Sequence, residues 1–207
     1  IEYEAVHAIH GFTDLRRRLE ADRRCYAFFH PAMPNEPIIF VEIALARGMA
    51  AQVQPLLAPD APVLDADKAD TAVFYSITNC HEGLRGIPFG SFLIKQVAED
   101  LTQRLPRLRR FATLSPIPGF AAWLKAQPCW ETLGPVLGAK DWAEDPKVAR
   151  EMERVLKPLC AHYFLKVKKG SEPRDPVARF HLRNGAELDR INWLGDTSEA
   201  GLKASFG

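Results

Sequence analysis

Few residues of this chain point to metal or redox chemistry. Its four cysteines are widely spaced and form no C-x-x-C pair, so neither a zinc ribbon nor a dithiol redox motif is indicated. The pairs Cys80–His81 and Cys160–His162 could serve as metal ligands, but buried thiols beside structural histidines are the simpler interpretation. We therefore predict no metal, and reduced thiols in a cytoplasmic protein.

Long apolar runs and an excess of charge of one sign are also missing. No apolar stretch approaches the length of a membrane-spanning helix, and 27 basic residues balance 26 acidic ones. Bulk electrostatic binding to nucleic acid or to a membrane surface is therefore not expected. The 207 residues, 47% of them hydrophobic, suffice for a buried core in one or two domains. A start at Ile1 without a signal peptide is typical of a fragment of a longer protein.

Local sequence patterns predict strands and helices around one sheet. Residues 25–31 and 37–45 are apolar, β-branched and aromatic runs separated by MPNE, which predicts two adjacent antiparallel strands. Residues 125–165 keep a helical periodicity and predict a helical insertion. Further strands are predicted at residues 71–80 and 111–116, and helices at 12–24, 49–58, 89–104 and 119–126. The pattern indicates a mixed α/β (α+β) fold, with a mostly antiparallel sheet flanked by helices.

The charged helix near the start has a simple interpretation. Thr13 is its expected N-cap, and residues 16–18 form a basic triplet. These arginines could contact phosphates, but we expect them on a solvated helix face.

Residues 177–193 alternate apolar and polar side chains and are interrupted by Asn184-Gly185. This dipeptide is a strong hairpin signal, so we predict two strands with His181 on the first. Histidine exchanges a proton near neutral pH. A strand histidine bonded to a backbone carbonyl is the ordinary alternative to a catalytic one.

A glycine-bearing turn follows the strand predicted at residues 71–80. It runs from His81 to Ser91, and the apolar stripe of a helix begins at Phe89. A strand–turn–helix unit directs backbone N–H groups and the helix dipole toward one point, where they can bind phosphate. Gly86 and Gly90 permit close backbone approach. An ordinary tight connection is an equally good interpretation of the turn alone.

Ser115 lies at the end of the strand predicted at residues 111–116, and prolines follow it at positions 116 and 118. A serine at such a strand end can bind a ligand or act as a nucleophile. It can equally cap a following turn. The G-x-S-x-G elbow of hydrolases is absent.

These segments resemble a known family when they are taken together. The turn Arg85–Gly90 is similar to the acyl-CoA loop of GNAT-type acetyltransferases, [QR]-x-x-G-x-[GA], with proline and phenylalanine as departures. Residues 30–45, 74–97, 111–120 and 175–196 resemble the catalytic domain of the malonyl-CoA decarboxylase family. LSPIPGF and the FHLxNGA…RINW block are the most specific of these motifs. The resemblance is weakest across residues 125–160.

The resemblance implies a fold, an activity and a site. The fold is GNAT-like, with residues 1–24 ending a preceding helical region and residues 25–207 forming the catalytic domain. The substrate is malonyl-CoA, no cofactor is needed, and the full-length protein is a homo-oligomer, for which a tetramer is one option. Ser115 and His181 are the implied catalytic pair. The implied substrate-binding residues are Arg85, Gly86, Ile87, Pro88, Phe89, Gly90, Ser91, Ser115 and His181.

Three other functions fit parts of the same sequence. A GNAT-type N-acyltransferase needs an amine acceptor before it releases CoA. A non-catalytic acyl-CoA-binding module keeps the turn but tolerates loss of His181. Thioester hydrolysis by Ser115 and His181 yields malonate rather than acetyl-CoA and CO2. His30 and His81 are weaker site candidates and are expected to be structural, as are Asn184, Arg190 and Asn192.

Overall fold

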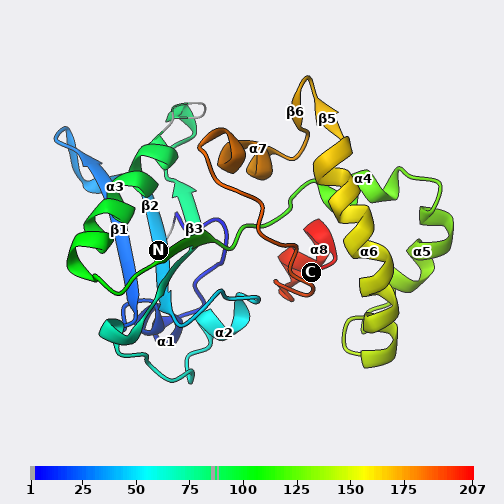
Figure 1. The fold of residues 1–207 in the computed structure, drawn as a ribbon, viewed down its shortest axis with the longest axis horizontal. Helices are drawn as coiled ribbons and strands as arrows, with labels where there is room; N and C mark the ends of the chain where they lie inside the picture. Colours follow the sequence, from blue (N-terminus) through cyan, green and yellow to red (C-terminus); the bar gives the residue numbers. More distant parts are fainter. Residues whose placement is uncertain (1–2, 85–86, 88) are drawn as a thin grey trace. The chain divides into compact units, whose positions relative to one another are not determined.

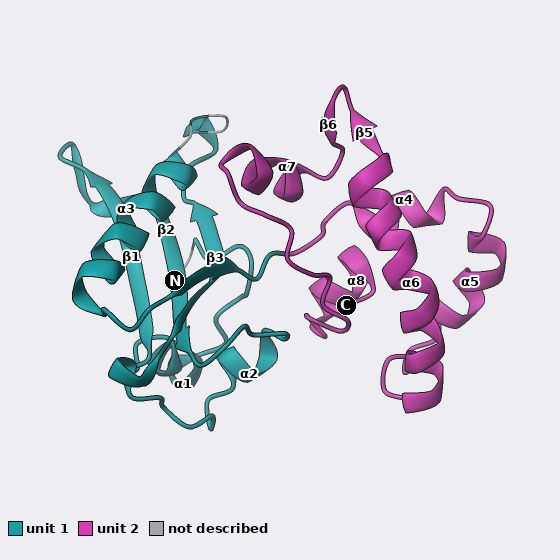
Figure 2. Cartoon of the chain, in the orientation of Figure 1, with its two compact units in different colours: residues 1–115 teal, residues 116–207 magenta. Residues whose placement is uncertain are grey.

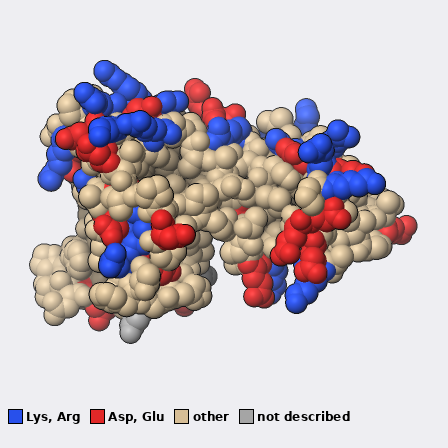
Figure 3. Space-filling view, turned by 90° about the horizontal axis from the view of Figure 1, so that it is seen from below, with Lys and Arg blue, Asp and Glu red and all other residues tan. Residues whose placement is uncertain are grey.

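The computed structural model describes residues 3–84, 87 and 89–207. Its contacts divide the chain into two compact units, residues 1–115 and 116–207 (Figure 2). We call these unit 1 and unit 2. No helix among the described residues is long and apolar enough to cross a membrane. Basic and acidic side chains are interspersed on the face shown in Figure 3, in keeping with the net charge of +1.

Unit 1 contains a four-stranded mixed sheet with strand order β1-β2-β3-β4 (Figure 1). The strands are β1 (Arg23–His30), β2 (Met33–Ala46), β3 (Thr71–Asn79) and β4 (Arg110–Thr113). β1 with β2 and β2 with β3 are antiparallel, whereas β3 and β4 are parallel. The mixed α/β fold and the adjacent antiparallel strands at residues 25–45 are therefore confirmed.

Period-two alternation gives this sheet a core on each face. Side chains of β2 such as Ile39, Val41 and Ile43 are buried with Leu93 and Val97 of α3 (Phe89–Arg104). On the other face, Ala44, Val73 and Tyr75 cluster with residues around α2 (Gln54–Leu57). The sheet is thus a middle layer, and α3 has the bounds that its apolar stripe predicts. The helix predicted at residues 49–58 is limited to α2, and two short 3-10 helices, η1 (Ala66–Lys68) and η2 (Glu82–Leu84), complete unit 1.

The first helix differs from its prediction in length and in environment. α1 spans Phe12–Arg17, and its N-cap is Gly11 rather than Thr13. Arg17 and Arg18 are buried, with 3% of each side chain exposed, so the expected solvated face is wrong. Arg16 does lie at the surface. α1 is part of unit 1, while the assignment of residues 1–24 to a preceding helical region and of residues 25–207 to one catalytic domain stays a prediction.

Unit 2 is mainly helical. Its helices are α4 (Phe120–Lys125), α5 (Trp130–Leu137), α6 (Pro146–Lys166), α7 (Pro176–Arg183) and α8 (Glu199–Ser205). A short hairpin of β5 (Lys168–Lys169) and β6 (Glu172–Pro173) connects α6 to α7. Aromatic side chains fill much of the core, where the Phe120, Trp123 and Tyr163 rings lie 5.3–5.9 Å apart. α5 and α6 occupy the range in which the periodicity predicts helices.

The hairpin predicted at residues 177–193 is wrong, because the first half of this segment is α7 and the second half is irregular. Asp175-Pro176 starts the helix: the Asp175 carboxylate accepts hydrogen bonds from the Val177 and Ala178 amides, at 3.0 and 2.9 Å. Gly185, with φ +85°, ends it. The amides of Gly185 and Ala186 donate to the Leu182 and His181 carbonyls, which makes a Schellman motif.

Candidate functional site

In unit 1, the predicted site residues follow two parallel strands. β3, α3 and β4 form a strand–helix–strand unit, and β3 pairs with β4 from Thr71 to Phe74. The carboxyl ends of β3 and β4 therefore point the same way, toward the turn before α3 and toward Ser115. Ligands of α/β proteins commonly bind at such an edge. The strand–turn–helix order expected for the acyl-CoA turn is present.

The turn itself is described only in part. Arg85, Gly86 and Pro88 lie outside the described residues. The Ile87 side chain is 44% exposed, and the Phe89 amide donates to the Ile87 carbonyl at 2.9 Å. In the first turn of α3, Gly90 is buried and Ser91 is half-buried. The α3 amino end thus follows the turn directly, and a phosphate-binding role stays a prediction.

β3 extends beyond the end of β4 at this edge. The last β3–β4 pair is Phe74 with Thr113, whereas β3 continues to Asn79 in pairing with β2. The Leu114 amide still donates to the Phe74 carbonyl at 2.9 Å, and the described residues include no strand partner for β3 on that side beyond this bond. The main-chain groups of residues 75–79 on that side are therefore not committed to a sheet ladder.

Ser115 lies where the chain leaves this pairing. It is half-buried, two residues after the end of β4, as the sequence predicts. Its neighbour Leu114 packs on the cluster of Val73 and Tyr75, which fixes the backbone just before the serine. Pro116 follows and restricts the backbone beyond it.

In unit 2, His181 lies in the last turn of α7 rather than on a strand. Its ring is half-buried and meets the Phe180 ring edge-on, with centroids 5.0 Å apart. Burial lowers the pKa of His181 below its usual 6.5, because desolvation disfavours the imidazolium. A histidine that readily gives up its proton suits a proton donor, provided that it is protonated at the working pH.

Asp175 is a helix cap that the sequence patterns above do not predict. It is fully buried and fixes the amino end of α7, six residues before His181. Next to it, a β-carbon at Gly119 would clash with the Tyr163 hydroxyl and lie 3.6 Å from Oδ2 of Asp175. Burial and the charge of Asp175 raise the pKa of Tyr163. The Asp-Pro dipeptide, a typical helix start, could have revealed this cap.

The weaker candidates make local contacts, and their expected structural roles stay predictions. Nδ1 of His30 accepts a hydrogen bond from the Ala32 amide at 3.1 Å, within the β1–β2 turn. His81 packs on the Tyr3 ring, with centroids 5.8 Å apart. Asn184, expected in a hairpin, is instead the C-cap of α7 and donates to the Phe180 carbonyl at 2.7 Å. Arg190 donates to the Asn192 side chain at 2.8 Å.

The four cysteines are separate thiols. Burial raises the pKa of the Cys25 thiol to about 11 and that of Cys160 to about 12. All four thiols are free. Within the described part of the chain, no three His, Cys, Asp or Glu side chains gather as metal ligands would.

Comparison with known families gives a match over the whole chain. The model of the malonyl-CoA decarboxylase C-terminal domain matches residues 1–207. The chain belongs to this family.

Named relatives agree with the family match. The mitochondrial malonyl-CoA decarboxylase of Anser anser anser is 38% identical over 235 residues, which cover 99% of this chain and 46% of that protein. The mitochondrial enzyme of Rattus norvegicus is 34% identical over 236 residues, covering 100% of this chain and 48% of the relative. The chain therefore spans about half the length of the curated malonyl-CoA decarboxylases it matches.

Solved structures of this family have the same fold. The malonyl-CoA decarboxylase of Agrobacterium vitis superposes with a TM-score of 0.93 at 48% identity, over 100% of this chain and 54% of that one. The structure from Rhodopseudomonas palustris gives 0.91 at 47% identity, over 100% of this chain and 53% of the other. The mixed α/β fold expected from the malonyl-CoA decarboxylase resemblance is thereby supported.

Proposed function

We propose that the full-length protein converts malonyl-CoA to acetyl-CoA and CO2. The observation that carries this proposal is the family match over residues 1–207, to relatives named malonyl-CoA decarboxylase. The β3–α3–β4 unit supports it, because Ser115 and the turn before α3 both follow the carboxyl ends of its parallel strands. In this proposal, residues Arg85 to Ser91 hold the substrate, and no cofactor beyond the CoA thioester takes part.

The reaction requires two contributions from the protein: stabilisation of an enolate and delivery of a proton. The bond between the carboxylate carbon and C2 breaks, CO2 leaves, and the electron pair moves into the thioester to give an enolate. Hydrogen-bond donors aimed at the enolate oxygen stabilise that charge by about 2.7–4 kcal/mol each. C2 must then receive a proton, and a positioned acid contributes roughly 10²–10⁴-fold to the rate.

His181 is the proposed acid, and Ser115 positions the malonyl group or relays a proton. The His181 imidazolium gives its proton to C2 and is protonated again by solvent. Because burial lowers the pKa of His181, the imidazolium is depleted as the pH rises through that lowered value. We therefore expect kcat to fall with rising pH on a limb that lies below the usual histidine pKa of about 6.5.

Product analysis with the full-length protein tests the proposal. Malonyl-CoA should yield acetyl-CoA and CO2, and His181→Ala should lower kcat by roughly 10²–10⁴-fold and remove the limb. His162→Ala, at an exposed histidine of the same unit, is the matched control and should leave the rate unchanged. An undiminished rate in the His181 variant would refute the proton-donor role.

The same assay separates the alternative functions. Malonate as the main product would indicate thioester hydrolysis, and CoA released only in the presence of an amine would indicate an N-acyltransferase. Binding of malonyl-CoA without any turnover would indicate a non-catalytic acyl-CoA-binding module.

Compartment and assembly complete the proposal. The free cysteines fit a reducing compartment, and we propose the cytoplasm, although the curated relatives are named mitochondrial. We also propose a homo-oligomer for the full-length protein, as the family resemblance implies. Fractionation of cells and the solution mass of the full-length protein test these two points.

A further inference from the structure

The helix that carries His181 buries little apolar surface of its own. None of the eight residues of α7, all of which the structure describes, is buried, and Leu182 is 41% exposed. Ala178 packs at the margin of the aromatic core of unit 2. Short helices in proteins owe most of their stability to tertiary contacts. The position of α7 therefore depends on contacts other than a buried apolar face.

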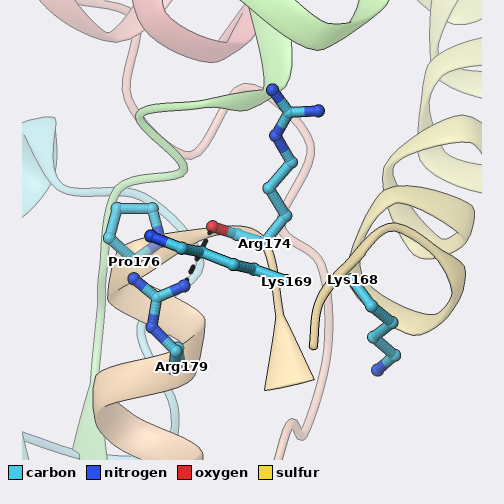
Figure 4. Close-up of a pocket in the computed structure, with 5 residues that line it drawn as sticks. All are labelled: Lys168, Lys169, Arg174, Pro176 and Arg179. Carbon is cyan, nitrogen blue, oxygen red and sulfur yellow. Dashed lines mark hydrogen bonds between the residues drawn. The ribbon is translucent and has the colours of Figure 1, made fainter. Parts of the chain in front are cut away.

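Polar contacts with the β5–β6 hairpin provide part of this support. The Arg179 guanidinium donates to the Pro173 and Arg174 carbonyls, at 3.1 and 3.4 Å (Figure 4). Arg183, whose side chain is 63% exposed, binds both carboxylate oxygens of Glu172. Solvent screens an ion pair at such a position, so it contributes little to fixing the helix.

The start of α7 is held by a buried charge. The Asp175 side chain is fully buried, and its Oδ1 accepts the Val177 and Ala178 amides at 3.0 and 2.9 Å. Its other oxygen, Oδ2, is also buried and has no hydrogen-bond partner among the described residues. Burial of an ionised carboxylate costs much desolvation free energy, so the place of Asp175 requires an explanation.

A second Asp-Pro helix start in unit 2 shows that capping does not require burial. Asp145 and Pro146 begin α6, and the Asp145 carboxylate accepts the Lys147 and Val148 amides at 2.8 and 3.2 Å. Asp145 is exposed, so its charge stays hydrated while it caps the helix. The two starts share the dipeptide and the pair of bonds and differ in burial. Capping alone therefore does not account for the buried position of Asp175.

The environment of Oδ2 of Asp175 includes the Tyr163 hydroxyl. Both atoms lie beside Gly119, where an added β-carbon would clash with the hydroxyl and lie 3.6 Å from Oδ2. Tyr163 is 2% exposed, and its ring packs on those of Phe120 and Trp123 with centroids 5.9 and 5.3 Å away. The surrounding rings thus fix the hydroxyl in place on α6.

The charge of Asp175 acts on α6 at this point. Burial raises the pKa of Tyr163 and the negative charge of Asp175 raises it further, whereas Arg174 acts in the opposite direction. Burial and the same charge raise the pKa of Cys160, one turn earlier on α6, to about 12. Both side chains therefore keep their protons near neutral pH, and the Tyr163 hydroxyl is available to the carboxylate as a donor.

We propose that Asp175 and Tyr163 are positioning residues for His181. The buried carboxylate ties the start of α7 to the Tyr163 hydroxyl of α6, and the helix transmits this fixed direction to the imidazole in its last turn. The inference rests on the proposed function, in which His181 protonates C2 of the substrate.

The length of the helix determines how strongly an error at the cap is felt. His181 lies six residues after Asp175, which corresponds to about 9 Å along a helix, so a tilt of roughly 10° at the cap would displace it by about 1.5 Å. A misplacement of about 1 Å can cost on the order of 10²-fold in rate.

The experiment compares the two Asp-Pro helix starts in the full-length protein. Asp175→Ala removes the buried cap, Tyr163→Phe removes the hydroxyl but neither capping bond, and Asp145→Ala removes the exposed cap as the matched control. We expect kcat for malonyl-CoA to fall on the order of 10²-fold in Asp175→Ala and about tenfold in Tyr163→Phe, with KM near the parent value. Asp175→Asn keeps an oxygen for the two amides and should restore most of kcat. Asp145→Ala should leave kcat unchanged.

The pH dependence separates positioning from a general loss of stability. Burial lowers the pKa of His181, so a displaced and better hydrated imidazole should move the kcat limb of the Asp175→Ala protein up toward about 6.5. A loss of folded protein alone would scale the rate and leave the limb where it is.

Two results would overturn the inference directly: an equal fall of kcat in Asp145→Ala and Asp175→Ala, or a fall without movement of the limb. If Asp175→Ala does not fold, Tyr163→Phe decides, because an undiminished kcat in that variant would refute the link through the hydroxyl. Failure of the parent protein to form acetyl-CoA would refute the proposed function and the inference with it. Full kcat in every variant of an active parent would refute the inference alone.

Discussion

The two units bury very different side chains. Unit 1 combines an aliphatic sheet core with a cluster of buried charges, in which Arg17 and Arg23 pair with Asp22 at 2.7 and 3.0 Å and Arg18 pairs with Glu42 at 2.8 Å. Unit 2 relies on packed aromatic rings, and Asp175 is the buried charged residue found among its described residues. One unit is therefore specified by charge pairing and the other by ring packing.

This contrast predicts different responses to change. Buried charges cost much desolvation free energy, so removal of one partner leaves the other in an unfavourable site. Aromatic packing tolerates changes of pH but is sensitive to small changes in volume. Each unit should therefore have its own weak point.

Removal of Asp22 should have the largest effect on stability. Asp22→Ala leaves Arg17 and Arg23, which are 3% and 5% exposed, without their carboxylate. We expect a loss of about 3–5 kcal/mol in the free energy of unfolding of unit 1. Denaturant unfolding with amide hydrogen exchange measures it, because exchange resolves the two units.

Glu20→Ala is the control for this change. Glu20 pairs with Arg16, whose side chain is 74% exposed, and this pair should contribute only about 0–1 kcal/mol. If both variants cost the same, the buried cluster does not stabilise unit 1 in the way described.

Gly119→Ala should be the next largest change, and it acts on unit 2. The added methyl group meets the Tyr163 hydroxyl, and overpacking of this kind costs about 1–3 kcal/mol. Tyr163→Phe removes the obstructing oxygen, so the double variant should regain much of the loss. Thermal unfolding of the single and double variants tests the contact, and a double variant no more stable than Gly119→Ala would contradict it.

Acidification from neutral pH should have the smallest of these effects on stability, and it should destabilise unit 1 before unit 2. Burial alone would raise the pKa of Asp22, but hydrogen bonds from Arg17 and the Leu64 amide, with the charge of Arg23, lower it on balance. A lowered carboxyl pKa contributes stability that is complete above the unfolded value of about 3.9 and disappears as the pH falls through the folded value.

In unit 2 the carboxyl with a lowered pKa is that of the surface residue Glu172, beside Arg183. Solvent screens this pair, so its contribution should be small. Hydrogen exchange followed from pH 6 downward should therefore show unit 1 losing protection before unit 2. The reverse order would contradict the comparison of the two units.

Local sequence patterns were sufficient to predict the strands of the sheet and the helix α3. The apolar runs at residues 25–45 and the four-residue stripe from Phe89 determine strand and helix whatever surrounds them. The burial of Arg18 could not be inferred in this way, because its partner Glu42 lies 24 residues away in sequence and meets it only in the folded sheet. The close approach of the Tyr163 hydroxyl to Gly119 could not be predicted either, because Tyr163 lies on α6, far from Gly119 in sequence.

The site was predicted by motif, but its local structure was not. Ser115 follows β4 as expected, whereas His181 lies on a helix. Asn-Gly ends helices as readily as it turns hairpins, because both need a residue with positive φ. The preceding Asp175-Pro176 decides between the two, because Asp175 caps the helix and Pro176 occupies its first position.

The two caps of α7 have a consequence for protein engineering. Eight residues rarely form a stable helix in water, but here Asp175 and Pro176 specify the start, and Asn184 and Gly185 the end. The boundaries therefore do not depend on the residues between them. Variant libraries at the half-buried positions 177–180 can be screened around His181 with the helix register preserved, so that α7 can be varied as one cassette whose two ends stay fixed.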